Sequence, residues 1–154
     1  MEKESLKIKI SNDGIKPVGK SKFYGDVLTL KTFKIYIVRN DKEFIYIGKT
    51  TQQIGTKFGQ GFRAFTKDKD ENERISGYGG YKWIEEFEDK ELNLDVIDLG
   101  DNATDEFAEA VEAEIVFQIR QRYLYWPKYQ NEIHFNNNHK EAFKTAQEIL
   151  ELIK

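Results

Sequence analysis

The chain has 154 residues, 39% of them apolar and 14% aromatic, and a net charge of −3, so its composition fits one compact domain with its own core. Cysteine is absent, which excludes disulfides and thiolate metal sites. The first residues, MEKESLKIKI, lack the apolar stretch of a signal peptide, and no run of 18 apolar residues occurs. We therefore expect a soluble cytoplasmic domain with no membrane partner.

Charge is distributed unevenly along the sequence. Residues 31–82 hold eleven Lys and Arg against six Asp and Glu, a balance of +5, whereas residues 83–120 hold thirteen acids against two bases, a balance of −11. Both runs can be solvated faces of the fold. A basic patch that faces nucleic-acid phosphates is the alternative, although the overall charge by itself does not favour such a partner.

The first half of the chain predicts mainly strands. Residues 6–10, LKIKI, indicate a strand, followed by a turn around Pro17 and a further extended piece at 26–33. Residues 33–39 and 43–49 are rich in Ile, Val, Phe and Tyr and flank the turn residues RNDKE. This pattern predicts a β-hairpin.

A helix is expected next, over residues 50–65. Thr50 or Thr51 is the expected N-cap, because a hydroxyl oxygen there can accept from a free backbone N–H group. The glycines at positions 55, 59 and 61 are expected to turn the end of this helix into a loop. The polar segment 67–80 that follows predicts a flexible connection.

The second half predicts a short helix, a third strand and two long helices. These segments are, in order, residues 83–87, 91–100, 102–125 and 139–154. Thr104 or Asp105 is the expected cap of the first long helix, and Pro127 is expected to end it. Trp83 and Trp126 are expected to anchor the core.

These elements together predict an α+β fold with a small, mainly antiparallel central sheet and helices packed around it. We expect a single domain over residues 1–154. Its core would span about residues 33–131, with an N-terminal strand extension at 1–32 and a C-terminal helix at 139–154.

The sequence Gly48-Lys49-Thr50 resembles the end of a nucleotide-binding phosphate loop. That loop needs another glycine five residues before Gly48, and position 43 is Glu. Residues 43–48 are also apolar and β-branched, which favours a paired strand over a wrapped loop. The sequence therefore argues against a nucleoside triphosphatase.

The hairpin register decides what its two tyrosines can do. If Arg39 pairs with Glu43 across a three-residue loop, Tyr36 falls directly opposite Tyr46, and a slip of one residue sends them to opposite faces. Taken alone, the pair is explained by a cross-strand contact that stabilises the sheet by about 0.2–1 kcal/mol.

Further motifs accompany the tyrosine pair. Ile35-Tyr36 precedes Tyr46-Ile47-Gly48, and the two tyrosines are ten positions apart. A basic residue follows in the first helix, a Glu in a later helix, and a Pro-x-Tyr-Asn-like element at 127–131. In these motifs and in its element order the chain resembles the GIY-YIG nuclease family over about residues 33–131. The resemblance implies a metal-dependent endonuclease that hydrolyses phosphodiester bonds of DNA, with RNA not excluded.

The resemblance implies roles for five residues. Tyr36 and Tyr46 take the places of the two motif tyrosines, one of whose phenols would act as the general base that activates water. Because a free phenol has a pKa near 10, Lys49 would support it or hold a phosphate oxygen. Glu112 would hold one Mg²⁺ or Mn²⁺ ion, since apolar residues follow it three and four positions later. Glu114 is the alternative ligand.

The chain departs from the family pattern at three positions. Lys34 stands for the first glycine, Lys57 for the helix arginine, and Gln130 for the terminal asparagine, where it would orient its neighbours. Arg63, six residues after Lys57, is the alternative cation. These departures motivate a second hypothesis, a catalytically inactive domain that binds nucleic acid or another protein.

Two tyrosines in a glycine-rich stretch allow two interpretations. Tyr78 and Tyr81 belong to GYGGYKW, where an aromatic ring can stack on a nucleic-acid base or can belong to a packed loop.

Overall fold

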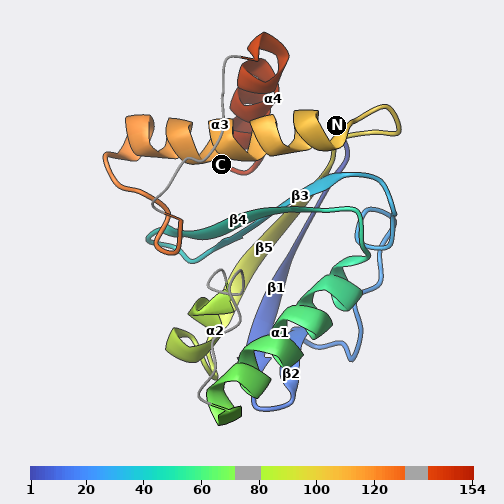
Figure 1. The fold of residues 1–154 in the computed structure, drawn as a ribbon, viewed down its shortest axis with the longest axis vertical. Coiled ribbons are helices and arrows are strands. Elements are labelled where there is room, and N and C mark those ends of the chain that lie inside the picture. The colour runs from blue at the N-terminus through green and yellow to red at the C-terminus, as the bar shows by residue number, and fades with distance from the viewer. Residues whose placement is uncertain (72–80, 131–138) are drawn as a thin grey trace.

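The computed structural model describes residues 1–71, 81–130 and 139–154 (Figure 1). The elements are, in chain order, β1 (Lys3–Ser11), β2 (Gly14–Pro17), β3 (Lys34–Arg39), β4 (Phe44–Thr50), α1 (Ile54–Glu71), α2 (Trp83–Glu86), β5 (Glu91–Asp98), α3 (Asp105–Tyr123) and α4 (Lys140–Leu152). Within these described ranges, no helix is long and apolar enough to span a bilayer.

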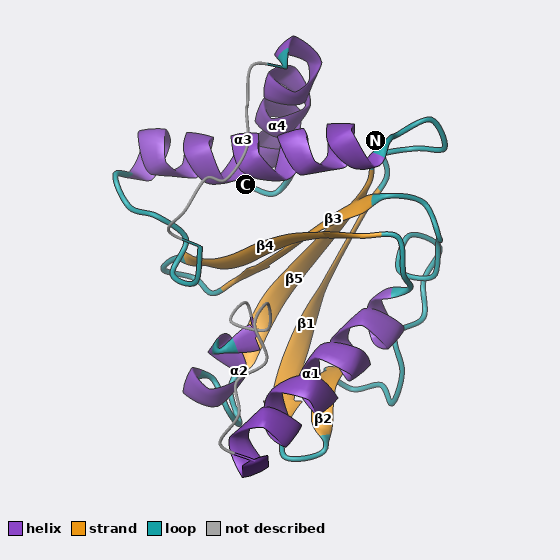
Figure 2. Cartoon of the chain, viewed as in Figure 1, coloured by secondary structure: helices purple, strands orange, loops and turns teal. Residues whose placement is uncertain are grey.

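The strands form one antiparallel sheet in the order β2-β1-β5-β3-β4, which confirms the predicted α+β class. Figure 2 shows α1 lying across β1 and β2, with α2 beside the same end of the sheet. At the other end, α3 crosses the strands and α4 packs on α3. Strand β3 lies inside the sheet, between β5 and the edge strand β4, and its side chains belong to both core clusters.

The two faces of the sheet are packed by different side chains. On one face, here called the aromatic face, buried residues that include Tyr36, Phe58, Tyr81 and Trp83 pack together with partly buried Tyr46. The other, the aliphatic face, carries residues that include Ile35, Ile37, Ile47, Ile97, Val111, Ile115, Ala142, Ala146 and Ile149. This separation follows from the alternation of side chains along each strand.

The hairpin is confirmed, but the register considered for it, with Arg39 opposite Glu43, does not form. Tyr36 pairs with Gly48, and Val38 pairs with Tyr46. A bulge after Val38 sets Arg39 opposite Phe44 instead of Glu43. The turn explains the shift, because the Asn40 carboxamide accepts the backbone N–H groups of Lys42 and Glu43. The tyrosines still share a face, as diagonal neighbours.

The first helix is longer than predicted. It runs through its three glycines to Glu71. Neither expected threonine caps it, because Thr50 still belongs to β4 and the first helical bond joins Lys57 N–H to the Gln53 carbonyl. Packing explains the continuity: the Phe23 ring lies beside exposed Gly55, and the Tyr81 ring lies directly over Gly61, which is buried.

The N-terminal extension also differs from its prediction. Pro17 ends strand β2, and the predicted turn follows it directly, because Lys20 N–H donates to the Pro17 carbonyl at 3.4 Å. Residues 26–33, however, are not extended. A turn occupies this segment instead, because Thr29 N–H donates to the Gly25 carbonyl and Val27 N–H donates to the Glu4 carboxylate. The structure therefore ties the segment to β1 by a side chain.

The remaining elements follow the predicted pattern closely. Thr104 caps α3, since its hydroxyl oxygen accepts the Phe107 N–H. The helix ends at Leu124, whose φ of 64° is left-handed, three residues before Pro127. Trp83 is fully buried, as expected. The caps and breakers of this half are local, which is why the sequence reveals them.

Candidate active site

Three tyrosines from separate elements meet on the aromatic face. Tyr36 comes from β3, Tyr46 from β4, and Tyr81 from the residues just before α2. The ring centroids of Tyr36 and Tyr46 lie 6.0 Å apart, and those of Tyr46 and Tyr81 lie 6.5 Å apart. Tyr36 and Tyr81 are buried, whereas Tyr46 is half-buried. We call these three residues the tyrosine cluster.

Two glycines make room for this cluster. A Cβ atom on Gly48 would lie 2.3 Å from the phenol oxygen of Tyr36, and one on Gly61 would lie 2.2 Å from Cζ of Tyr81. Contacts so short would force the rings to move. The glycines that seemed to break α1 and to imitate a phosphate loop therefore hold space for phenols.

Other aromatic rings fix the orientation of the cluster. Tyr36 meets the ring of Phe58 edge-on at 5.5 Å, and Tyr81 stacks on Trp83 at 6.0 Å. The Tyr81 hydroxyl also donates to the Lys57 carbonyl at 3.4 Å. Rings held from two sides keep their hydroxyl groups in place.

Glu112 of α3 lies within electrostatic range of the cluster. Its carboxylate accepts a hydrogen bond from Gln130 Nε2 at 3.4 Å. Burial raises the pKa of Glu112 to about 7; Lys49 and Lys57 oppose this effect, and Glu109 adds to it. A carboxyl group balanced between burial and two cations changes charge readily when another cation approaches.

The phenols themselves remain protonated at neutral pH. Burial raises the pKa of Tyr36 well above its ordinary value, and the nearby Tyr46 and Tyr81 raise it further. Burial also raises the pKa of Tyr46, as does Glu112, while a hydrogen bond with Tyr36 acts in the opposite direction. In the free protein these groups are hydrogen-bond donors.

Two predicted cations act on Glu112 from different elements. Lys49 lies near the end of β4 and forms an ion pair with Asp105 in the first turn of α3. Lys57 lies on α1, one turn before Gly61, and is half-buried. Both affect the pKa of Glu112, so the structure brings them to the same region.

Gln130 holds the free edge of β4. Its Oε1 atom accepts the N–H group of Ile47 at 2.6 Å, and its Nε2 atom donates to the Ile47 carbonyl and to Glu112. The two residues before it donate backbone N–H groups to carbonyls of β4. The Gln130 amide is thus engaged in positioning Glu112 against the strand.

Two other candidates lie elsewhere. Arg63 lines a separate groove on another side of α1, together with Lys16 and Lys22. Glu114 is buried and forms a hydrogen bond with Gln118, whose amide contacts α4. The structure therefore joins Glu112, and not Glu114, to the tyrosines.

Lys34, which stands at the first glycine of the family motif, holds the backbone that leads into β3. Its side chain is fully buried, and its amine donates to the carbonyls of Leu30 and Thr32. Burial lowers its pKa, although nearby Asp98 opposes that effect. This lysine secures the segment that enters β3.

The carboxylate of Glu112, beside the tyrosine cluster, is the candidate ligand for a metal ion. Among the described residues, no group of three or more His, Cys, Asp or Glu side chains is placed to hold a metal. Mg²⁺ commonly keeps several waters and binds through one or two carboxylates together with substrate phosphates. Glu112 fits an ion held in that way.

Tyr81 and Gly61 were not among the predicted site residues. Nothing in the sequence indicates that Gly61 and Tyr81 are in contact, because they are far apart in the chain and belong to no common motif. Tyr78, the other tyrosine of that stretch, lies outside the described residues.

No family model, curated protein or solved structure matches the chain. The resemblance to GIY-YIG nucleases therefore stays a prediction, which depends on the motif residues and on the arrangement described above.

Proposed function

We propose that the chain is a metal-dependent nuclease that hydrolyses phosphodiester bonds of DNA, with RNA as the other possible substrate. One observation supports the proposal most strongly: Glu112, which lies more than sixty residues after Tyr46 in the chain, accepts a hydrogen bond at 3.4 Å from Gln130, whose amide also binds Ile47, the residue next to Tyr46. Lys49 and Lys57 act on the same carboxylate. Carboxylate, phenols and cations are the groups that phosphodiester hydrolysis needs in one place.

Exposure distinguishes the roles of the two phenols. Tyr46 is half-buried and would contact the attacking water, whereas buried Tyr36 would hold Tyr46 in position. Because both phenols are protonated, Tyr46 orients water as a donor, and it becomes a base only when positive charge lowers its pKa. Lys49 is the nearest side chain of β4 with such a charge.

The remaining groups would stabilise charge on the phosphate. Lys49 and Lys57 would oppose the negative charge that develops on its oxygens, an effect worth several kcal/mol in an enclosed site. Glu112 would hold Mg²⁺ or Mn²⁺. When bound, such an ion polarises a phosphoryl oxygen and lowers the pKa of its waters.

A nicking assay on supercoiled plasmid tests the proposal. The wild-type protein should nick with Mg²⁺ or Mn²⁺ and not with chelator. Glu112→Gln should lower the rate about 100-fold or more. Glu106→Gln, an exposed glutamate on the same helix, is the matched control and should leave the rate unchanged. Equal rates in Glu112→Gln and wild type would refute the site assignment.

A second candidate, a binding domain without catalysis, has its own support. Both phenols have raised pKa values, and Lys49 is already paired with Asp105. Under this alternative, folded wild-type protein would bind DNA or RNA in a salt-dependent way and cleave neither with any added metal. Lack of nucleic-acid binding even at low salt would leave a protein-interaction role.

A further inference from the structure

A groove of about 860 Å³ separates α1 from the N-terminal extension. Strand β2 and the segment 21–24 form one wall, and one side of α1 forms the other. In Figure 1, α1 crosses over β2 at this edge of the sheet. The lining includes Lys16, Lys22 and Arg63, all three of them exposed.

The two walls come from segments without acidic residues. Residues 14–25 and 48–66 together contain six Lys and Arg and no Asp or Glu, in a chain that holds 27 acids. Among the residues that the structure describes, Asp13 is the one acid in the lining of the groove. The second segment also carries Lys49 and Lys57, so α1 and β4 extend the same positive charge from the candidate active site to the groove.

A second acid of the extension, Glu4, is engaged in hydrogen bonding within the wall. The Glu4 carboxylate accepts Val27 N–H at 2.6 Å, and the Leu28 carbonyl accepts Ile54 N–H at 3.0 Å. These bonds attach the turn at 25–29 to β1 on one side and to the start of α1 on the other. The groove is therefore formed in the free protein, which lowers the entropic cost of binding.

Aromatic side chains complete the groove. Phe23 packs edge-on against Phe58, with ring centroids 5.8 Å apart, and so belongs to the wall. Tyr24 is 64% exposed at the rim. Arg63 folds back over Gly59, since a Cβ there would lie 3.2 Å from its Nη1 atom. An exposed ring beside lysines and an arginine suits a base and its phosphates.

We infer that this groove binds an unpaired nucleic-acid strand: Lys16, Lys22 and Arg63 contact its phosphates, and Tyr24 stacks on a base. The strand is unpaired because only an unpaired base offers its face to a ring at the rim. The link to cleavage rests on the proposed nuclease function, whereas binding in the groove does not.

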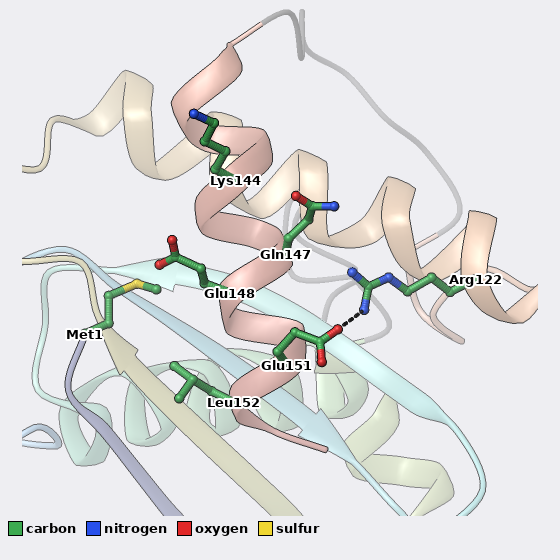
Figure 3. Close-up of a pocket in the computed structure, with 7 residues that line it drawn as sticks. All are labelled: Met1, Arg122, Lys144, Gln147, Glu148, Glu151 and Leu152. Atoms are coloured by element: carbon green, nitrogen blue, oxygen red, sulfur yellow. Dashed lines mark hydrogen bonds and ion pairs between the residues drawn. The ribbon is translucent and has the colours of Figure 1, made fainter.

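A second hollow in the surface lacks the net positive charge that a nucleic-acid strand needs. It lies between the N-terminus and α4, with a volume of about 680 Å³ (Figure 3). Arg122 and Glu151 form an ion pair of 3.3 Å there, and Lys144 shares the surface with Glu148. Its charges are balanced, so it does not favour a polyanion. It supplies one control lysine for the experiment, Lys144.

Fluorescence anisotropy with a labelled single DNA strand, in chelator and over a series of salt concentrations, tests the inference. The double variant Lys22→Ala/Arg63→Ala should lower the slope of log affinity against log salt by about 1.4, since each lost contact with a single strand removes about 0.7. The control Lys140→Ala/Lys144→Ala changes two exposed lysines of α4 and should keep the wild-type slope.

Tyr24→Ala separates stacking from charge. It should weaken binding about fivefold or more without changing the salt slope, because stacking on a base releases no counterions. A duplex of the same sequence should bind more weakly than the strand and should be insensitive to Tyr24→Ala. The same strand made of RNA identifies the natural ligand by whichever form binds more tightly.

The possible results separate this inference from the proposed function. Equal slopes for groove and control variants, or unchanged strand affinity in Tyr24→Ala, would overturn the inference even if plasmid nicking occurs. Groove-dependent binding would establish it even if no metal supports cleavage. Each variant should first show a wild-type unfolding transition, which is expected because all substituted side chains are exposed.

Discussion

The aromatic and aliphatic faces of the sheet share their strands and differ in chemistry. On β3, Tyr36 and Val38 point to the aromatic face, and Ile35 and Ile37 point to the aliphatic face. The aromatic face meets α1 and α2 through rings whose polar tips converge on the candidate active site. The aliphatic face meets α3 and α4 through Ile, Val and Ala side chains that have no polar atoms.

This difference indicates that the two faces contribute differently to stability and to chemistry. Branched aliphatic side chains and alanines allow two helices to pack closely, which contributes stability. Rings with hydroxyl groups pack well only where a neighbour is small, and here glycines supply that space. We therefore expect substitutions on the aliphatic face to change stability alone, and those on the aromatic face to change chemistry as well.

The largest expected effect on stability comes from the aliphatic face. Ile115→Ala removes a fully buried side chain between α3 and the sheet, so the free energy of unfolding should fall by about 2–5 kcal/mol. Nicking activity per folded molecule should stay at the wild-type level. Urea unfolding together with the plasmid assay measures both, and a loss of activity in fully folded protein would break the comparison.

Glu112→Gln should stabilise the protein while it removes activity. Burial raises the pKa of Glu112 from its ordinary value of 4.5 to about 7, so the folded state prefers the neutral form. Wild-type stability should then decline as the pH rises from about 4.5 to about 7 and level off above that, because over this range the carboxyl ionises in the unfolded state and stays neutral in the folded state. Gln stays neutral, so without metal the variant should gain up to about 2–3 kcal/mol at pH 8 and nothing near pH 4.

Thermal unfolding in chelator across this pH range measures the effect. If stability depended on pH in the same way in wild type and Glu112→Gln, ionisation of the Glu112 carboxyl would not destabilise the folded protein. Glu106→Gln again serves as the control, because that side chain is exposed.

Gly48→Ala sharpens the comparison between the faces. The added methyl group would overlap the Tyr36 phenol, which should cost about 1–3 kcal/mol of stability. Because Tyr36 would shift away from Tyr46, nicking should also fall at least tenfold in folded protein. If activity stayed normal despite lower stability, the position of Tyr36 would have no part in catalysis.

The smallest expected effect comes from Tyr81→Phe. This change keeps the ring on Trp83 and removes the hydroxyl that bonds to the Lys57 carbonyl. Stability should fall by about 0.5–1.5 kcal/mol, the usual net value of one hydrogen bond. Because Tyr81 also raises the pKa of Tyr46, the pH dependence of nicking should shift toward lower pH. A profile identical to wild type would restrict Tyr81 to packing.

Local features made much of the fold predictable. Runs of β-branched residues and the turn residues between them predict the hairpin and β5, and a threonine cap predicts the start of α3. These signals act within a few positions of the chain. The hairpin register was not predictable in this way. It depends on how the Asn40 side chain bonds to the backbone of the turn, which inserts a bulge that no alternation pattern encodes.

Long-range packing decided the features that the sequence concealed. Glycine is a poor helix former, so Gly55 and Gly61 suggested a broken helix. In the structure, rings from Phe23 and Tyr81 lie over them, and tertiary contact outweighs propensity. Glu112 was proposed from its match to the pattern of the family that the chain resembles, whereas the contact of Gln130 with β4 was not predicted, because the two partners are eighty-three residues apart.

The way Gln130 binds Ile47 also bears on how the molecule avoids self-association. An outer strand with free N–H and C=O groups invites the strand of another molecule to join it. On β4 the carboxamide occupies one such pair of groups, much as a neighbouring strand would. At the opposite margin, β2 has only four residues and ends in Pro17, which lacks an N–H group. Both margins thus resist the addition of strands, which protects the protein against fibril formation at high concentration.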